Sequence, residues 1–426
     1  MSFRDAGPIR SLAIFACLLT RLAAPAQAPS LSQEDAVAQA LKASPAVAAA
    51  RRHVTESEAH VAEMEGAKKL QISLDASVSE SNGRIAEPPA MQTFGAAEAT
   101  LTAPIPNQGR ASALVDQARE VVLAARAQLK RAMLDVEFRT TQAFFELRRA
   151  REGQDIAQQN FDQATRQAGD TRKRIDAGDV PAADLLKAQV QVAQNRAALA
   201  RAKIAVSVAL QNLNDLLQRD LDAPVDLAQP PASPPPVSID AKAAVALALA
   251  ESPDAAEAQA NLDAAKANTR FARHARDLDY SLGLSHVRSS DITSDSYLTT
   301  LGLTVSFPIV DGGVAAQQIK QAILQEGQAE SSLRLARQAV RLAVEQALLD
   351  VEGGESDVDA TAATEEIARQ SLEKARQSYD AGLTTTRDVL DAQLVYSQSR
   401  VDANSARYDL EIARAKLKQL LGGRLP

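Results

Sequence analysis

The chain has 426 residues and a formal net charge of -7, with 46% hydrophobic residues but no Trp and only 3% aromatic residues. A compact core of this size normally depends on large aromatic side chains, so this composition favours closely packed Ala-rich helices and an elongated protein. The acidic balance argues against nucleic acid as a partner. Cys17 is the only cysteine, which excludes an intrachain disulfide and a thiolate metal cluster.

The start of the chain, residues 1–28, has the pattern of a secretory signal peptide. Two arginines precede an apolar run from Leu12 to Ala24, and two small-x-small cleavage motifs follow it. We expect cleavage after Ala26. The alternative is a lipoprotein signal acylated at Cys17, although the residues before Cys17 form a poor lipobox. Without residues 1–28 the chain has 44 basic and 53 acidic residues, a net charge of -9.

The remaining chain is a tandem repeat of a unit of about two hundred residues. Residues 36–45 return at 244–253, and residues 184–189 return at 388–393, with nearly the same offset. A proline-rich segment, which cannot continue a helix, separates the two copies. The sequence therefore predicts a first repeat at 29–222, a linker at 223–238 and a second repeat at 239–426.

Each repeat is predicted to contain a helix followed by a β-hairpin. The first helix is expected over residues 33–68. From Ile72 to Val78 apolar and polar residues then alternate with a period of two, as they do again from Tyr297 to Phe307. Strands of about ten residues are long enough to cross a membrane at a tilt. The hairpins are predicted at about 70–106, with a loop near 82–89, and at about 278–310, with a loop near 289–296.

After each β-hairpin the sequence predicts a long helical hairpin. Apolar residues recur every seven positions from Val115 to Ala164, a pattern that imposes left-handed supercoiling. In the second copy Leu394, Val401, Tyr408 and Ala415 recur in the same way. Glycine ends one helix and proline, or a Thr385–Asp388 capping box, begins the next. The helical hairpins are predicted at about 110–220, with a tip near 178–181, and at about 313–421, with a tip near 382–385.

The predicted strands require partners. Beyond the signal, no stretch approaches the roughly 18 to 20 apolar residues of a membrane helix, so a membrane-crossing part must be a β-barrel. Four strands cannot close a barrel, and open edges in lipid cost several kcal/mol per unpaired group. Several chains are therefore expected to share one barrel.

This combination of features resembles the TolC-like outer-membrane efflux protein family. Its most specific parts are residues 307–313, at the exit from the last strand, and residues 379–382 followed by 388–393, at the second helical tip. The resemblance extends from about Leu31 to Leu421. It implies a mainly α fold with a membrane β part. The long antiparallel helical hairpins would form an α-barrel, and four strands per chain would enter a shared trimeric β-barrel.

The resemblance implies a non-enzymatic channel-tunnel subunit of a tripartite efflux or type I secretion system. Such a homotrimer would lie in outer-membrane lipid with its helices in the periplasm. It would act as a passive exit duct for a periplasmic adapter and an inner-membrane pump, without a cofactor. The alternative is a soluble periplasmic coiled-coil adapter or structural protein, which leaves the alternating strands without a role.

The resemblance also implies site residues at the helical tips. A ring of aspartates around a narrow axis would attract cations. Helix capping, packing at a helix seam and ordinary solvation are the competing interpretations of these residues, and Thr384 stands where relatives can carry a basic gate partner. The expected residues of the periplasmic entrance are Asp388, Asp391, Tyr379 and Asp184, and those of the adapter-docking tips are Gly178, Gly382 and Leu383.

Overall fold

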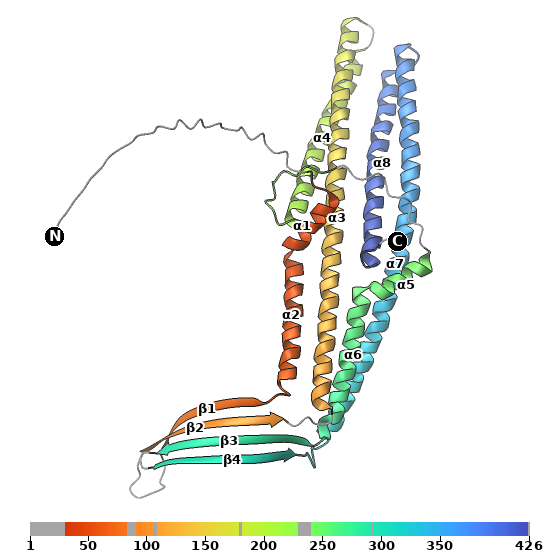
Figure 1. Ribbon diagram of the computed structural model, residues 1–426. Helices are drawn as coiled ribbons and strands as arrows, with labels where there is room; N and C mark the ends of the chain where they lie inside the picture. Colours follow the sequence, from red (N-terminus) through yellow and green to blue (C-terminus); the bar gives the residue numbers. More distant parts are fainter. Residues whose placement is uncertain are drawn as a thin grey trace, which may run out of the picture.

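The computed structural model describes residues 30–82, 91–104, 109–178, 181–228, 240–291 and 294–424. The predicted signal peptide with Cys17, nearly all of the first hairpin loop, residues 105–106 of the first β-hairpin and most of the proline-rich linker lie outside these residues. Within them, long helices stand side by side on one end of a four-stranded sheet (Figure 1). The sheet and the helical tips are therefore at opposite ends of the molecule.

Each half of the chain begins with two helices that meet at a Ser-Pro junction. Helix α1 (Gln33–Ala43) ends before Ser44, and α2 (Pro45–Gly66) follows at once. The single helix predicted over 33–68 is therefore interrupted. The cause is Pro45, because a residue before proline disfavours the helical conformation, and Ser44 is extended at φ -60° and ψ 120°. The second half repeats this break between α5 (Ala241–Glu251) and α6 (Pro253–Arg273), with the short helix η1 (His274–Arg276) after it.

The sheet joins the two halves of the chain. Its strands are β1 (Gln71–Asn82), β2 (Met91–Pro104), β3 (Asp279–Asp291) and β4 (Ser294–Ser306), antiparallel in the order β1-β2-β3-β4. The loop predicted near 289–296 is shorter than expected, since β3 continues to Asp291 and β4 resumes at Ser294. Strands β1 and β4 form the two edges of the sheet.

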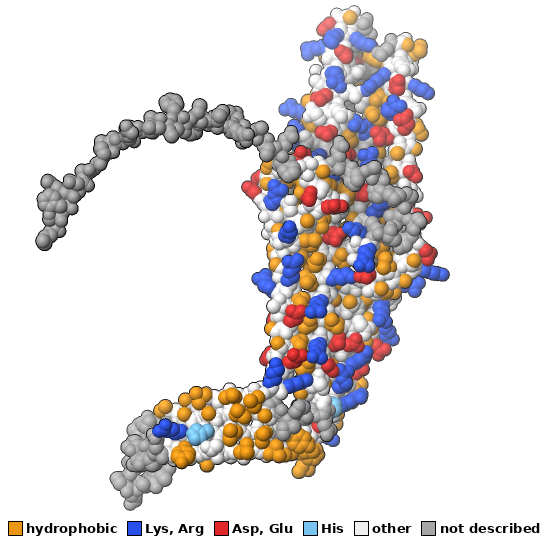
Figure 2. All heavy atoms as spheres, viewed as in Figure 1, with side chains coloured by type: hydrophobic (Ala, Val, Ile, Leu, Met, Phe, Trp, Pro, Cys, Tyr) orange, Lys and Arg blue, Asp and Glu red, His pale blue; other side chains and the backbone are white. Residues whose placement is uncertain are grey.

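One face of this sheet is apolar and exposed across all four strands. Leu101 lies opposite Ile72 and Leu284, and Leu284 lies opposite Leu301, which is 71% exposed. The other face carries mainly Ser, Thr and Gly, and on β2 and β3 it is the more sheltered one. Figure 2 shows the hydrophobic side chains gathered over the sheet, whereas charged side chains are spread along the helices. Further exposed apolar residues of this face are Leu74, Val78, Leu282, Leu303 and Val305.

Four long helices form the upright part of the molecule. Helices α3 (Arg110–Asp176) and α7 (Val314–Asp380) have 67 residues each, and α4 (Ala182–Leu216) and α8 (Thr386–Leu420) have 35 each. At about 1.5 Å per residue the longer pair extend roughly 100 Å. Helix α3 packs along α4, and α7 packs along α8. Among the described residues, no helix has the length and apolar character needed to cross a membrane.

The predicted seven-residue seams are covered to different extents. On α3, Val115, Val122 and Val136 are buried. On α8, Tyr408 is buried, but Leu394 near the tip is 60% exposed. The second seam is therefore only partly covered within one chain.

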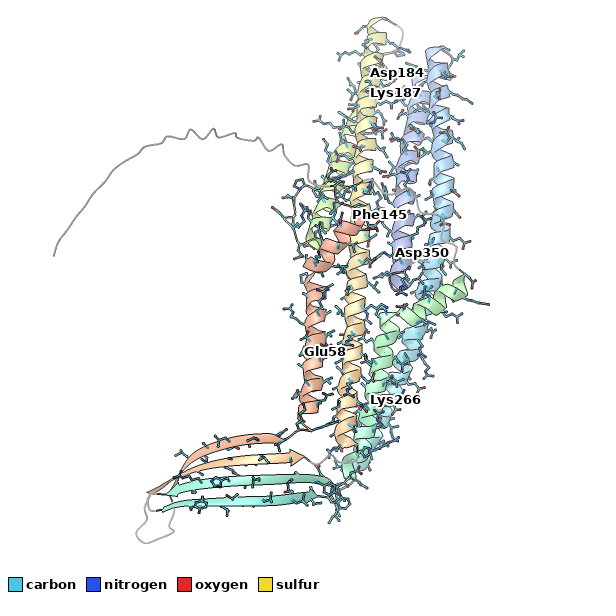
Figure 3. The ribbon with its side chains drawn as sticks, viewed as in Figure 1. Glu58, Phe145, Asp184, Lys187, Lys266 and Asp350 are labelled. Atoms are coloured by element: carbon cyan, nitrogen blue, oxygen red, sulfur yellow. The ribbon has the colours of Figure 1, made fainter. Side chains whose placement is uncertain are left out.

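The apolar core lies at mid-height, where the short helices meet the long ones. One cluster surrounds Phe144, Phe145 and Leu213, and a second surrounds Val344 and Leu417; Phe145 is labelled on α3 (Figure 3). Each half contributes a pair of fully buried alanines on its first helix, Ala36 and Ala40 in one and Ala244 and Ala248 in the other. The repeat seen in the sequence is thus also a repeat of packing.

Candidate functional site at the helical tips

The turn between α7 and α8 is closed by backbone hydrogen bonds. The N–H of Gly382 donates to the Tyr379 carbonyl at 3.0 Å, and the N–H of Leu383 donates to the Ser378 carbonyl at 2.8 Å. This is the Schellman arrangement, and Gly382 has the left-handed φ of +74° that it requires. An apolar residue after the glycine commonly folds back on its own helix. Here Leu383 is instead 79% exposed.

The turn between α3 and α4 begins in a similar way. The N–H of Gly178 donates to the Ile175 carbonyl at 2.9 Å, and Gly178 has a φ of +83°. Residues 179–180 lie outside the described part, and Pro181 stands at the N-cap of α4. A side chain added at Gly178 or Gly382 would meet no atom within 4 Å. Both glycines therefore present open backbone surface at the end of the molecule.

Asp388 caps helix α8. Its Oδ2 accepts hydrogen bonds from the Thr385 N–H and hydroxyl, both at 2.8 Å, and the Asp388 N–H donates to Thr385 Oγ1 at 3.4 Å. This reciprocal pair is the capping box predicted from the sequence. The hydrogen bonds from Thr385, first from its backbone and then from its side chain, lower the pKa of Asp388. The carboxylate thus stabilises the start of α8, in line with the alternative interpretation that Asp388 caps its helix. Its role at the periplasmic entrance stays a prediction.

The other two predicted acidic residues each lie near a basic residue of their own helix. Asp391 is exposed, with its carboxylate 3.6 Å from Arg387 Nε. Asp184 is more sheltered and pairs with Lys187 at 3.0 Å; both lie on α4 near its tip (Figure 3). At the offset that relates 184–189 to 388–393, Lys187 occupies the position of Asp391. The two halves therefore bring opposite charges to equivalent places.

Tyr379 connects the two helical hairpins. The Arg174 guanidinium, on the last turn of α3, lies 4.6 Å from the centre of the Tyr379 ring on α7. This distance is typical of a cation–π contact. The Thr384 hydroxyl donates to the Ala375 carbonyl at 3.5 Å, within its own hairpin. Sequence reasoning singled out Tyr379 but missed Arg174.

Below the tips, α3 and α8 are joined mainly by polar groups. Gln163 Nε2 donates to Gln393 Oε1 at 2.7 Å, and Asn160 Nδ2 donates to Ser397 Oγ at 2.6 Å. Nearer mid-height the buried Tyr408 hydroxyl donates to Glu152. Burial first, and then the hydrogen bond with Glu152, raise the pKa of Tyr408. The contact between α3 and α8 is therefore polar toward the tips, whereas at Tyr408 it joins the buried apolar cluster of Phe144 and Phe145.

Comparison with known proteins assigns the fold and the family. A model of the family described as outer membrane efflux protein matches residues 36–218 and 244–423. These two segments contain most of α1 and α5, all of α2 and α6, all four strands and both helical hairpins.

The chain belongs to the outer membrane efflux protein family. Members are channels of the outer membrane and not enzymes, so the efflux channel class, the localisation and the non-enzymatic character predicted from the sequence are confirmed. Among the described residues, no group of three or more His, Cys, Asp or Glu side chains is placed to hold a metal ion.

Solved structures of membrane channels share this fold. CusC has a TM-score of 0.84 at 20% identity, with 92% of each chain covered. The CmeC outer membrane channel of Campylobacter jejuni has a TM-score of 0.82 at 19% identity. The match covers 92% of this chain and 85% of the CmeC chain. The open state of the Neisseria gonorrhoeae MtrE outer membrane channel has a TM-score of 0.78 at 18% identity. The match covers 92% of this chain and 89% of the MtrE chain. No curated protein sequence matches the chain. The predicted fold class, long antiparallel helical hairpins with a four-stranded membrane sheet, is confirmed.

Proposed function

We propose that this efflux protein works as a homotrimeric, passive exit duct, which receives its cargo from a periplasmic adapter and an inner-membrane pump. The observation that carries the proposal is the sheet with its apolar face exposed on all four strands. A sheet that is wet on both sides would not expose leucines in this way. Lipid covers such a face and leaves the polar face for a water-filled lumen.

The open edges of the sheet explain the need for further chains. Strands β1 and β4 are the outer strands of the 4-stranded sheet, and no other described strand pairs with their outer edges. Backbone groups at such edges are costly in lipid, so β4 of one subunit would pair with β1 of the next until the cylinder closes. The partly uncovered seam of α8 would be covered by a neighbouring subunit in the same assembly.

The tips are the proposed contact with the adapter. Gly178 and Gly382 present backbone without side chains, and Leu383 presents an apolar side chain beside them. An exposed leucine on a turn that is already closed by hydrogen bonds adds nothing to the fold of that turn. Contact with an apolar pocket on an adapter gives it a role. The transport energy would come from the pump, because this subunit supplies only the path.

Cysteine cross-linking tests the closed trimer. Cys17 is the only cysteine and lies in the expected signal peptide. Any disulfide in the mature protein should therefore come from the introduced cysteines. We would place one cysteine on β1, at Ser73 or Asp75, and scan β4 from Ser296 to Thr304 on the same face. In outer membranes at least one pair should give a covalent trimer on non-reducing gels.

A matched control pair places the second cysteine on β3, at Ser285, which is an inner strand of the sheet. This control should give no cross-link between subunits. Monomeric material with every β1 and β4 pair would contradict the trimer. Release of the protein from membranes by high salt would contradict the membrane sheet and favour the soluble adapter or structural protein instead.

A further inference from the structure

The two halves of the chain place equivalent helices in different surroundings. Helices of the second half begin 204 residues after their counterparts, α7 at 314 against α3 at 110, and α8 at 386 against α4 at 182. Helix α3 packs against α8, so the two halves meet there. The reverse combination is α7 with α4, and these two helices stand at the ends of the row α4, α3, α8, α7 in Figure 1. The described residues show no extended packing of α4 on α7.

The contact between α3 and α8 shows which residues the reverse pair would bring together. The ring of Phe145 on α3 lies 6.2 Å from the ring of Tyr408 on α8, centroid to centroid, and both side chains are buried. In the repeat, the counterparts of this pair are Leu349 on α7 and Ile204 on α4. Leu349 is 66% exposed and Ile204 is 64% exposed. Two large apolar side chains are thus uncovered at positions that are buried in the other half.

The uncovered positions continue along both helices with the spacing of a helix seam. Residues three and four apart fall on one side of a helix, and two such sides pack together in a coiled coil. On each helix one row with this spacing is exposed at every position. The rows are 342, 346, 349, 353, 356, 360, 363 and 367 on α7, and 189, 193, 196, 200, 203 and 207 on α4.

The same two stretches carry opposite charge. Residues 188–214 of α4 contain three basic residues and no acidic one, whereas residues 342–368 of α7 contain eight acidic residues and no basic one. Three side chains of each stretch are exposed and form no ion pair with any described residue. They make up a basic strip of Arg196, Arg201 and Lys203 on α4, and an acidic strip of Glu352, Asp357 and Asp359 on α7.

The repeat also places the two strips at the same height. Arg407 on α8 lies 4.0 Å from Glu152 on α3. Lys203 is the counterpart of Arg407, and residue 356, in the middle of the acidic strip, is the counterpart of Glu152. The carboxylates at 352, 357 and 359 all lie within about one helical turn of residue 356. Long basic side chains on α4 can therefore reach them when the helices pack as α3 and α8 do.

We propose that α4 of one subunit packs against α7 of the next, with Ile204 against Leu349 and the basic strip paired with the acidic strip. The inference rests on the homotrimer proposed above and names the surface that joins its helical parts. The occupant is a second copy of this chain, because one chain carries both complementary faces. Both the row of helices and the sheet run from the first half to the second, so pairing of β4 with β1 would bring α7 to α4 of the same neighbour.

A cysteine pair tests the predicted register. Asn160 on α3 donates a hydrogen bond to Ser397 on α8 at 2.6 Å, and the counterparts of these residues are Thr364 and Ala193. In outer membranes, the double variant Ala193→Cys, Thr364→Cys should give a covalent trimer on non-reducing gels. Ala193→Cys with Ala362→Cys is the matched control, because residue 362 is exposed at the same height on another side of α7. The first pair should give at least about fivefold more trimer than the control, since a disulfide requires close and suitably directed Cβ atoms.

Charge reversal tests the two strips. Replacing all three residues of the basic strip by Glu should lower the temperature at which half of the trimer dissociates in mild detergent by at least about 5 °C. Replacing the acidic strip by Lys in the same chain should restore most of that loss, because the pairs then form with exchanged signs. Restoration separates a lost contact from a misfolded chain. A combined variant that dissociates as readily as the first one would overturn the pairing of the strips.

The cross-links separate this inference from the trimer itself. If the β1 and β4 cysteines give a covalent trimer but Ala193→Cys, Thr364→Cys does not, only the α4–α7 interface is contradicted. Absence of both cross-links contradicts the proposed function. A disulfide formed within a monomer, or a cross-link from these positions to an adapter in place of a sister subunit, would also overturn the interface.

Discussion

The Arg174 guanidinium lies 4.6 Å from the centre of the Tyr379 ring, so the end of α3 is held against the end of α7 within one chain. A contact of this kind contributes about 0.5–1 kcal/mol at an exposed site. Arg174→Gln should therefore release the tips and raise the open probability in single-channel recordings by about two- to fivefold. Arg172→Gln, which removes a neighbouring exposed charge of α3, is the control. Identical gating in both variants would remove the Arg174–Tyr379 contact from the entrance.

Opposite charges at equivalent positions of the two halves predict opposite effects on ion selectivity. If both residues line the entrance, Asp391→Asn should lower the preference for cations, and Lys187→Gln should raise it, since each variant removes one sign of charge per subunit. Reversal potentials in a salt gradient measure this. Asp402 is an exposed residue of α8 farther from the tip, and Asp402→Asn serves as the control. Unchanged reversal potentials in Asp391→Asn would exclude that residue from the conduction path.

The exposed leucine at the second tip, Leu383, leads us to expect a variant that still assembles but no longer transports. Leu383→Trp should abolish efflux, measured as dye accumulation in cells, because a bulky ring blocks a fitted adapter contact. The trimer should remain, since Leu383 is 79% exposed and supports no packing in its own chain. Leu221→Trp, at an exposed leucine away from the tips, should leave efflux intact. Loss of the trimer in Leu383→Trp would show that the residue serves folding.

Much of the architecture could be predicted because local patterns determine it. The period of two in residues 72–78 requires a strand with two unlike faces, and the seven-residue spacing from Val115 requires a long packed helix. The break at Ser44 could have been predicted as well. A serine before a proline is both a helix cap and a conformational restriction, but the alanine-rich helical pattern on each side concealed it.

The contacts of the candidate site could be predicted less well, because they depend on which helix faces meet. The capping box at Thr385 and Asp388 is local and was found. Arg174 carries no local signal that connects it with Tyr379. About two hundred residues separate them, and they meet only because the two hairpins pack together, with α3 against α8. Lys187 did have a signal, namely its alignment with Asp391 in the repeat.

The turn from β4 into α7 predicts a stability that depends on pH. Asp311 Oδ1 and Oδ2 accept hydrogen bonds from the N–H groups of Gly313 and Ala315, both at 3.0 Å. These bonds, that from Ala315 first, lower the pKa of Asp311. The pKa of Asp311 is thus lower in the folded protein than in the unfolded chain. The ionised carboxylate therefore stabilises the fold at a pH above the ordinary carboxyl pKa, and this stabilisation is lost as the pH falls through the pKa of the folded state.

Asp311→Asn should accordingly lower the melting temperature at pH 7, and the difference from wild type should shrink as the pH is lowered toward 3. Thermal unfolding in detergent at a series of pH values measures this. Asp350→Asn, at an exposed position farther along α7, is the control and should melt as wild type at each pH (Figure 3). A difference from wild type that stays constant with pH would assign the effect of Asp311→Asn to packing instead of charge.

Two glycines with similar backbone angles predict unequal costs of substitution. Gly178 and Gly422 have φ values of +83° and +76°, so alanine at either position loses about 1–2 kcal/mol from its backbone conformation. At Gly178 the new methyl group would meet open space, whereas at Gly422 it would lie 2.7 Å from Glu251 Cβ. Glu251 pairs with Lys130 at 2.6 Å and so links α5 to α3.

Gly422→Ala must therefore displace the end of α5 as well as strain its own turn, at an additional cost of about 1–3 kcal/mol. Unfolding of the detergent-solubilised channel by guanidinium should show this larger loss relative to Gly178→Ala. Lys130→Met in the Gly422→Ala background distinguishes the mechanism. If the methyl group added by Gly422→Ala already breaks the Lys130–Glu251 ion pair, Lys130→Met should cost less stability in that background than it costs in the wild-type chain. Full additivity would mean that the turn adapts without moving Glu251.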